Sequence, residues 1–272
     1  MIEALEFEFM RNALLAGLFA SLICGIIGTF IVVNRLVFLT GGIAHATYGG
    51  IGIALFFGIP YILGTLGFAL IAAMIMTAVL LKAKSRADTF IGVIWAVGMA
   101  TGIILLDLTS GYNVNIMSYL FGSILAVSTS DIWWMAGLSI ITITAAIFFY
   151  RDLLAISYDD EFARLRGVPV NLIYFLFICL IAVSIVMIVR VVGLILVIAL
   201  FTIPPYIAEK YSNSLAMMMV MATLLAVLFN LSGLWLAYTY NLTSGATIIL
   251  VAATGFFISM AIDFIFLNKT AS

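Results

Sequence analysis

Long apolar runs separated by short polar breaks dominate the chain. An α-helix crosses a bilayer with about 17–25 apolar residues. By that criterion the sequence predicts nine spans, near 11–33, 37–57, 60–81, 89–107, 131–150, 170–189, 192–208, 214–237 and 244–267. Arg190 and Gly193 interrupt the run from 170 to 208, and in an alternative with eight spans its second half is a short or re-entrant helix. The fold class expected is therefore an all-α polytopic membrane protein with eight or nine transmembrane helices.

Two connections between the predicted spans are longer than a simple turn. The segment 108–130 contains an apolar stretch at 119–125 that is too short to span, which predicts an interfacial or re-entrant helix. The segment 151–169 is the only strongly charged stretch, with Arg151, Asp152, Asp159, Asp160, Glu161, Arg164 and Arg166 before Gly167-Val168-Pro169. Two interpretations stay open for 151–169: a solvated loop, or a docking site for a soluble partner.

The distribution of basic residues predicts the orientation, because Lys and Arg favour cytoplasmic loops. With the N-terminus outside and the C-terminus in the cytoplasm, only Arg11 and Arg190 of the 11 basic residues lie outside. The other nine fall on the cytoplasmic side: Arg35, Lys82, Lys84, Arg86, Arg151, Arg164, Arg166, Lys210 and Lys269.

Composition excludes several classes of protein. The chain is 66% apolar and 8% charged, whereas soluble domains are about 45–50% apolar and about a quarter charged. A net charge of −1 offers no basic surface for nucleic acid. The acidic start of the chain lacks the basic region of a secretory signal, so the first apolar run is expected to be retained as a span. No shift in composition divides residues 1–272, which predicts a single membrane domain.

Motifs for catalysis are missing from the sequence. It has no G-x-x-x-x-G-K-[ST] loop and no convincing nucleophile–base or metal-ligand cluster. We therefore expect no catalytic residue, no bound cofactor and no ATP hydrolysis by this chain. Any use of ATP requires another polypeptide.

Three features of the spans are candidates for a transport role. His45, the single histidine, lies in the inner third of the second span, where an ionisable group is costly and imidazole suits divalent transition metals. Asp107 ends the fourth span at its outer side, where a carboxylate attracts cations or is simply solvated. Pro204 and Pro205 predict a break in the helix near the cytoplasmic face and a protruding turn over 204–212. A structural, hydrogen-bonded histidine and an ordinary helix end are the alternatives for His45 and the proline pair.

Five blocks of sequence, in order, resemble the permease subunits of the zinc and manganese class of ABC importers. They are 41–52, 118–125, 158–169, 190–197 and 243–248. The resemblance implies a fold similar to that of the vitamin B12 and siderophore permeases. It implies a prokaryotic plasma-membrane homodimer surrounded by lipid, two cytoplasmic ATPase subunits that bind ATP, and an extracytoplasmic metal-binding protein. Members commonly carry a Gly-Asp pair shortly before the histidine, whereas this chain has Gly41-Gly42.

The function expected from this resemblance is import of a divalent transition-metal ion, namely zinc, manganese or iron, as the transported substrate. His45 and Asp107 are the candidate pathway residues. The candidate ATPase-contact residues are Asp159, Asp160, Glu161, Arg164, Gly167, Pro204 and Pro205, in the segments 151–169 and 204–212. Two alternatives remain: a permease for a metal chelate or cofactor, and a secondary transporter, which would need ion-coupling residues near the midplane.

Overall fold

The structure, a computed structural model, describes residues 6–82, 86–109, 124 and 127–270. Within these residues it contains nine helices that are long and apolar enough to cross a membrane. They are α1 (Glu8–Val33), α2 (Val37–Phe57), α3 (Tyr61–Lys82), α4 (Ala87–Asp107), α6 (Thr129–Phe148), α9 (Val170–Val192), α10 (Leu194–Tyr211), α11 (Leu215–Tyr240) and α12 (Ser244–Thr270). The prediction of an all-α membrane protein is confirmed, and each predicted span overlaps one of these helices.

The count of nine is set by the break between α9 and α10. Gly193 separates the two helices with φ of 86°, a backbone conformation that favours glycine. α10 is itself 18 residues long, so it is a full helix rather than a short re-entrant one. The interfacial helix predicted over 119–125 lies outside the described residues except for Ile124, whose side chain is buried.

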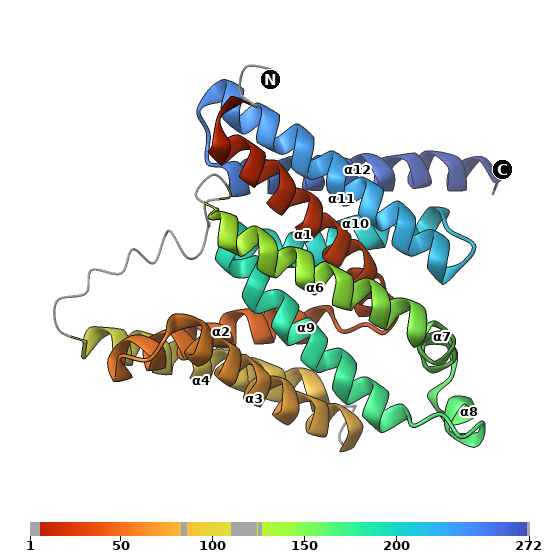
Figure 1. Cartoon of the computed structure of the whole chain (residues 1–272). Coiled ribbons are helices and arrows are strands. Elements are labelled where there is room, and N and C mark those ends of the chain that lie inside the picture. Colours follow the sequence, from red (N-terminus) through yellow and green to blue (C-terminus); the bar gives the residue numbers. More distant parts are fainter. Residues whose placement is uncertain (1–5, 83–85, 110–123, 125–126, 271–272) are drawn as a thin grey trace.

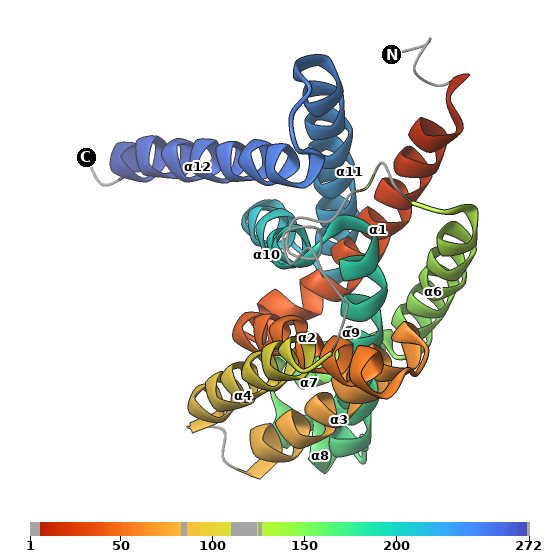
Figure 2. The ribbon, with the colours of Figure 1, turned by 90° about the vertical axis from the view of Figure 1, so that its left-hand side faces the viewer.

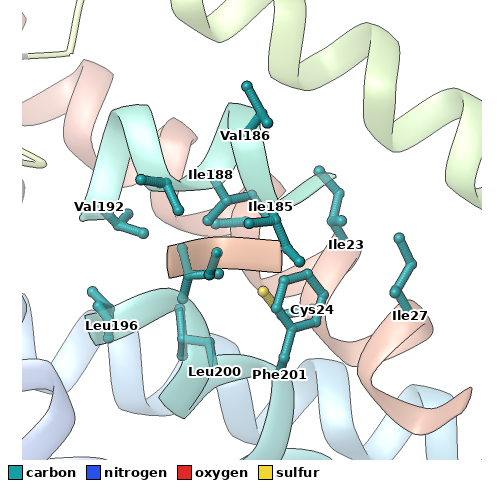
Figure 3. Packing of buried hydrophobic residues seen from close by; sticks show 14 of the residues in the cluster. Ile23, Cys24, Ile27, Ile185, Val186, Ile188, Val192, Leu196, Leu200 and Phe201 are labelled. Carbon is teal, nitrogen blue, oxygen red and sulfur yellow. The ribbon is translucent and has the colours of Figure 1, made fainter. Parts of the chain in front are cut away.

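The core lies where α1, α9 and α10 meet, and Figure 3 shows some of the buried hydrophobic side chains that fill it. Ile23 and Ile27 of α1, Ile185 and Ile188 of α9, and Phe201 of α10 are all fully buried. Around this centre, α2, α3 and α4 form one group beside α9, while α11 and α12 flank α10 (Figure 1). Figure 2 shows α12 projecting away from the rest of the bundle.

The predicted helix break at Pro204 and Pro205 is wrong, because α10 continues through both prolines to Tyr211. A proline removes the N–H that would bond the carbonyl four residues earlier. For Pro205 that carbonyl belongs to Phe201, and α1 packs directly on it at Gly28. A Cβ on Gly28 would stand 2.8 Å from the Phe201 oxygen and 2.7 Å from Pro205 Cγ. Membrane-spanning helices tolerate prolines where a neighbouring helix packs against the backbone groups that the proline frees. Both prolines are buried, so they do not form a protruding turn.

The segment 151–169 forms two short helices, α7 (Tyr150–Tyr158) and α8 (Asp160–Leu165), rather than an unstructured loop. Asp159 begins α8 as its N-cap: its Oδ1 accepts hydrogen bonds from the N–H groups of Glu161 and Phe162, both at 3.0 Å. Gly167 follows α8 with φ of 81° and turns the chain toward α9. We call the end of the bundle that carries α7, α8 and the α1–α2 turn the charged end.

Candidate functional site

His45 lies on α2 with its imidazole ring stacked on the indole ring of Trp95 from α4. The ring centroids are 4.1 Å apart and the planes differ by 14°. His45 is half-buried, and its buried Nδ1 has no hydrogen-bond partner within the part of the chain that the structure describes. The alternative of a hydrogen-bonded structural histidine therefore finds no support at this nitrogen. Trp95 in turn donates its Nε1–H to the sulfur of Met99 at 3.1 Å, which fixes the plane of the indole.

Glycines bring α2 and α4 close enough for this stack. On α4, Gly98 and Gly102 form a G-x-x-x-G pair, which allows membrane helices to approach closely. A Cβ on Gly98 would stand 2.8 Å from the Cα of Ala46, which follows His45 in the sequence. A Cβ on Gly102 would stand 2.5 Å from the backbone carbonyl oxygen of Tyr48. Real Cβ atoms do not approach so closely, so these glycines set the distance between the two helices and hence between Trp95 and His45.

One helical turn before His45, Gly41 leaves open space on the same face of α2. Residues four apart lie one above the other on a helix. A Cβ on Gly41 would meet no atom within 4 Å, whereas one on Gly42 would stand 2.4 Å from Ile91 Cγ2. Of the two glycines, only Gly41 therefore has room beside the imidazole for a larger group.

Asp107 ends α4 and is exposed, on the end of the bundle opposite the charged end. It is close enough to Tyr48 of α2 to interact with it electrostatically. Twelve residues separate Asp107 from Trp95 along α4, about 18 Å at 1.5 Å per residue. The structure therefore places Asp107 at the end of the α2–α4 pair that is opposite the charged end, and Asp107 does not contact His45.

Two ion pairs occupy opposite ends of the helices. Arg190 of α9 pairs with Asp131 of α6 at 3.1 Å, and Lys210 of α10 pairs with Asp263 of α12 at 2.6 Å. Each pair joins two helices, and its charges compensate each other, as charges within spans usually do. The Lys210–Asp263 pair thus ties α12 to α10.

The charged end presents apolar side chains that a membrane does not explain. Tyr158 and Leu165, the last residues of α7 and α8, are each 87% exposed, and Phe162 is 49% exposed. They lie among the charged residues of 151–169, outside the nine long helices. Exposed apolar groups with a polar rim are typical of a protein–protein contact. The sequence pattern draws attention to the charges and gives no sign of these three side chains, because periodicity cannot identify exposed apolar positions in helices of 9 and 6 residues.

The predicted contact residues fall into two sets in the structure. Asp159, Asp160, Glu161, Arg164 and Gly167 are together on or beside α8. Pro204 and Pro205 are buried within α10, so only neighbours such as Tyr206, Glu209 and Tyr211 are exposed there. Arg164 donates to Asn171 Oδ1 at 2.7 Å, which ties α8 to the start of α9.

The nine long apolar helices of the described residues, joined in part by ion pairs between helices, are typical of a polytopic membrane protein. The chain belongs to the ABC 3 transport family, whose model matches residues 6–263. The resemblance noted from the five sequence blocks is thereby confirmed, and the protein is a multi-pass plasma-membrane permease of an ABC transporter.

Several relatives are similar over nearly their whole length. An uncharacterized membrane protein of Synechocystis sp. is 48% identical, over 96% of this chain and 93% of that protein. The manganese transport system membrane protein MntC of Halalkalibacterium halodurans is 31% identical, over 93% of this chain and 87% of its own.

Two solved structures share the fold. PsaBC from Streptococcus pneumoniae, solved in complex with Fab, is 30% identical with a TM-score of 0.85, covering 95% of this chain and 93% of that one. A metal-chelate type ABC transporter in an inward-facing conformation has a TM-score of 0.73 at 16% identity, which supports the fold alone.

Proposed function

We propose that this chain is the membrane-spanning subunit of an ATP-driven importer of a divalent transition-metal ion, with manganese favoured over zinc and iron. Membership of the ABC 3 transport family carries this proposal, and the manganese transport names of its relatives favour the metal. The complete importer would be a homodimer of this chain, cytoplasmic ATPase subunits that bind ATP, and an extracytoplasmic metal-binding protein. The chain itself would hydrolyse no ATP, because it has no P-loop.

His45 is proposed as the metal-facing residue of the pathway. Its ring is held by Trp95, and its Nδ1 has no hydrogen-bond partner among the described residues, so the imidazole is preoriented and this nitrogen makes no hydrogen bond to them. Within the described residues, no three His, Cys, Asp or Glu side chains gather as a metal site. Further ligands would be backbone or hydroxyl oxygens, water, or groups of the second copy. A sparse ligand set binds an ion weakly, which allows the ion to leave for the cytoplasm.

The charged end is proposed as the ATPase contact, with α7 and α8 as its main elements. The exposed side chains of Tyr158, Phe162 and Leu165 would supply apolar contacts, and the surrounding charges a polar rim. From the 204–212 segment only the exposed residues of α10 would take part, since Pro204 and Pro205 are buried.

Uptake by reconstituted vesicles tests the proposed function. With permease, ATPase and binding protein together, we expect ATP-dependent accumulation of radiolabelled manganese. We expect weaker accumulation of zinc and iron, and no hydrolysis of ATP by the permease alone. Accumulation of a metal chelate in preference to every bare ion would instead establish a chelate permease, and manganese uptake without ATP would establish a secondary transporter.

The proposed orientation, with the N-terminus outside and the charged end in the cytoplasm, predicts one-sided labelling. Cysteines introduced at the half-buried position Asp160 and the exposed position Tyr211 should react with a membrane-impermeant maleimide only in inside-out vesicles. A cysteine at Ser130, exposed at the opposite end of the bundle, is the matched control and should react only in intact cells. Labelling of Asp160→Cys or Tyr211→Cys from outside would contradict this orientation.

A further inference from the structure

A polar cavity of about 490 Å³ opens at the charged end, between the α1–α2 turn, the end of α3, and α7, α8 and α9. Its charged lining comprises Arg35 of the turn, Asp159 and Asp160 before and on α8, and Arg164 of α8. Tyr158, one of the exposed contact residues, also lines it. The cavity is therefore continuous with the surface proposed to receive the ATPase.

Most polar groups of this cavity already have partners within the chain. Asn34 donates to Ser157 Oγ at 3.0 Å and accepts from the Tyr174 hydroxyl at 3.3 Å. Asp159 caps α8, Arg164 bonds Asn171, and Asp160 is likewise engaged. These interactions hold the walls together and leave little unmet charge.

Arg35 differs from its neighbours in this respect. It is exposed, and its guanidinium has no hydrogen-bond or ion-pair partner among the described residues. Its backbone has φ of 58°, the left-handed conformation in which glycine or asparagine usually ends a helix. An arginine at such a position adopts a backbone conformation that glycine would adopt with less strain, and such outliers concentrate at functional sites.

We infer that this cavity receives an acidic side chain of the ATPase subunit, and that Arg35 binds its carboxylate. The inference rests on the proposed function, because it requires that the charged end face an ATPase. A guanidinium presents paired N–H donors that match the two oxygens of a carboxylate. The other charged side chains of the cavity have partners within the chain, so the guanidinium of Arg35 is the group that an anion would pair with. The polar walls formed by α7 and α8 favour a protein side chain over a lipid headgroup, whose acyl chains require an apolar path beside it.

Arg35→Gly tests the inference, because it removes the guanidinium while suiting the left-handed backbone. We expect about tenfold weaker binding of the ATPase to the detergent-solubilised permease, with the thermal unfolding midpoint of the permease unchanged or raised. Arg86→Gln is the matched control: Arg86 is an exposed arginine on the same end that does not line the cavity. It should leave ATPase binding unchanged.

Arg35→Lys tests the carboxylate directly. It places a primary amine at the cavity, and a zero-length carbodiimide should join that amine to the ATPase in the assembled complex. The adduct should map to an Asp or Glu of the ATPase and be missing in Arg35→Gly.

Several outcomes would overturn the inference. The first is unchanged ATPase binding in Arg35→Gly. The second is a fall in the unfolding midpoint of Arg35→Gly that parallels its loss of binding. The third is that Arg35→Gly loses co-purifying anionic lipid while it still binds the ATPase. Asp160→Lys on α8 distinguishes a failure of the Arg35 inference from a failure of the proposed ATPase contact. If it weakens ATPase binding while Arg35→Gly does not, the ATPase contact stands and only the role of Arg35 fails. If neither variant affects binding, the charged end is not the contact.

Discussion

Replacing His45 by alanine is expected to reduce manganese uptake by at least about tenfold per assembled complex. Loss of even an outer-shell partner of a metal ligand costs about 10–100-fold in metal affinity, and His45 is proposed as a ligand itself. The fold should survive, because no described residue hydrogen-bonds to Nδ1 of His45 and would be left unsatisfied by the change. The lost stack on Trp95 should cost only about 0.5–1.5 kcal/mol of stability. Uptake by reconstituted vesicles, normalised to ATPase-bound permease, measures the effect.

A control on the same helix separates a pathway role from a packing role. Thr47 is buried two residues from His45, and its hydroxyl donates to the carbonyl of Ile43 at 2.8 Å, its one hydrogen bond among the described residues. Thr47→Ala should therefore leave uptake per complex near that of the parent protein. Normal uptake in His45→Ala would exclude His45 from the pathway, as would a loss of uptake that only tracks the loss of folded protein.

The sequence predicts the spans of this protein well because the bilayer imposes a simple length requirement. A helix must carry about 20 apolar residues to cross, whatever it packs against. The break between α9 and α10 was marked in the sequence by Arg190 and Gly193, and the structure places it at Gly193. The proline pair gave the wrong prediction because its effect depends on tertiary context. Gly28 of α1 packs over the Phe201 carbonyl that Pro205 leaves without a donor.

The environment of His45 was beyond prediction for a related physical reason. In lipid a helix is apolar on all sides, so its sequence does not show which face meets which neighbour. Gly98 and Gly102 suggest a close approach to some helix, but only the structure pairs them with α2 and so brings Trp95 onto His45. The charged end was recognised from its residues, yet its apolar contacts depend on where the short helices α7 and α8 end.

Truncating those apolar contacts is expected to separate the permease from its ATPase. Replacing Tyr158 and Leu165 together by alanine should weaken ATPase binding at least about 30-fold. Removing an interface hot spot costs about 2 kcal/mol or more, and tyrosine is enriched among hot spots. Both side chains are 87% exposed in the free chain, so permease stability should change by no more than about 0.5 kcal/mol. Binding of purified ATPase and ATP-dependent manganese uptake should fall together.

The opposite end of the bundle offers a matched control for that double variant. Tyr240, the last residue of α11, and Leu242 are 67% and 55% exposed, so the same two truncations can be made far from α7 and α8. The variant with Tyr240→Ala and Leu242→Ala should retain full ATPase binding. Full binding in the Tyr158→Ala and Leu165→Ala variant would contradict the assignment of α7 and α8 as the contact. Loss of binding in the control variant alone would place the ATPase at the other end and reverse the proposed orientation.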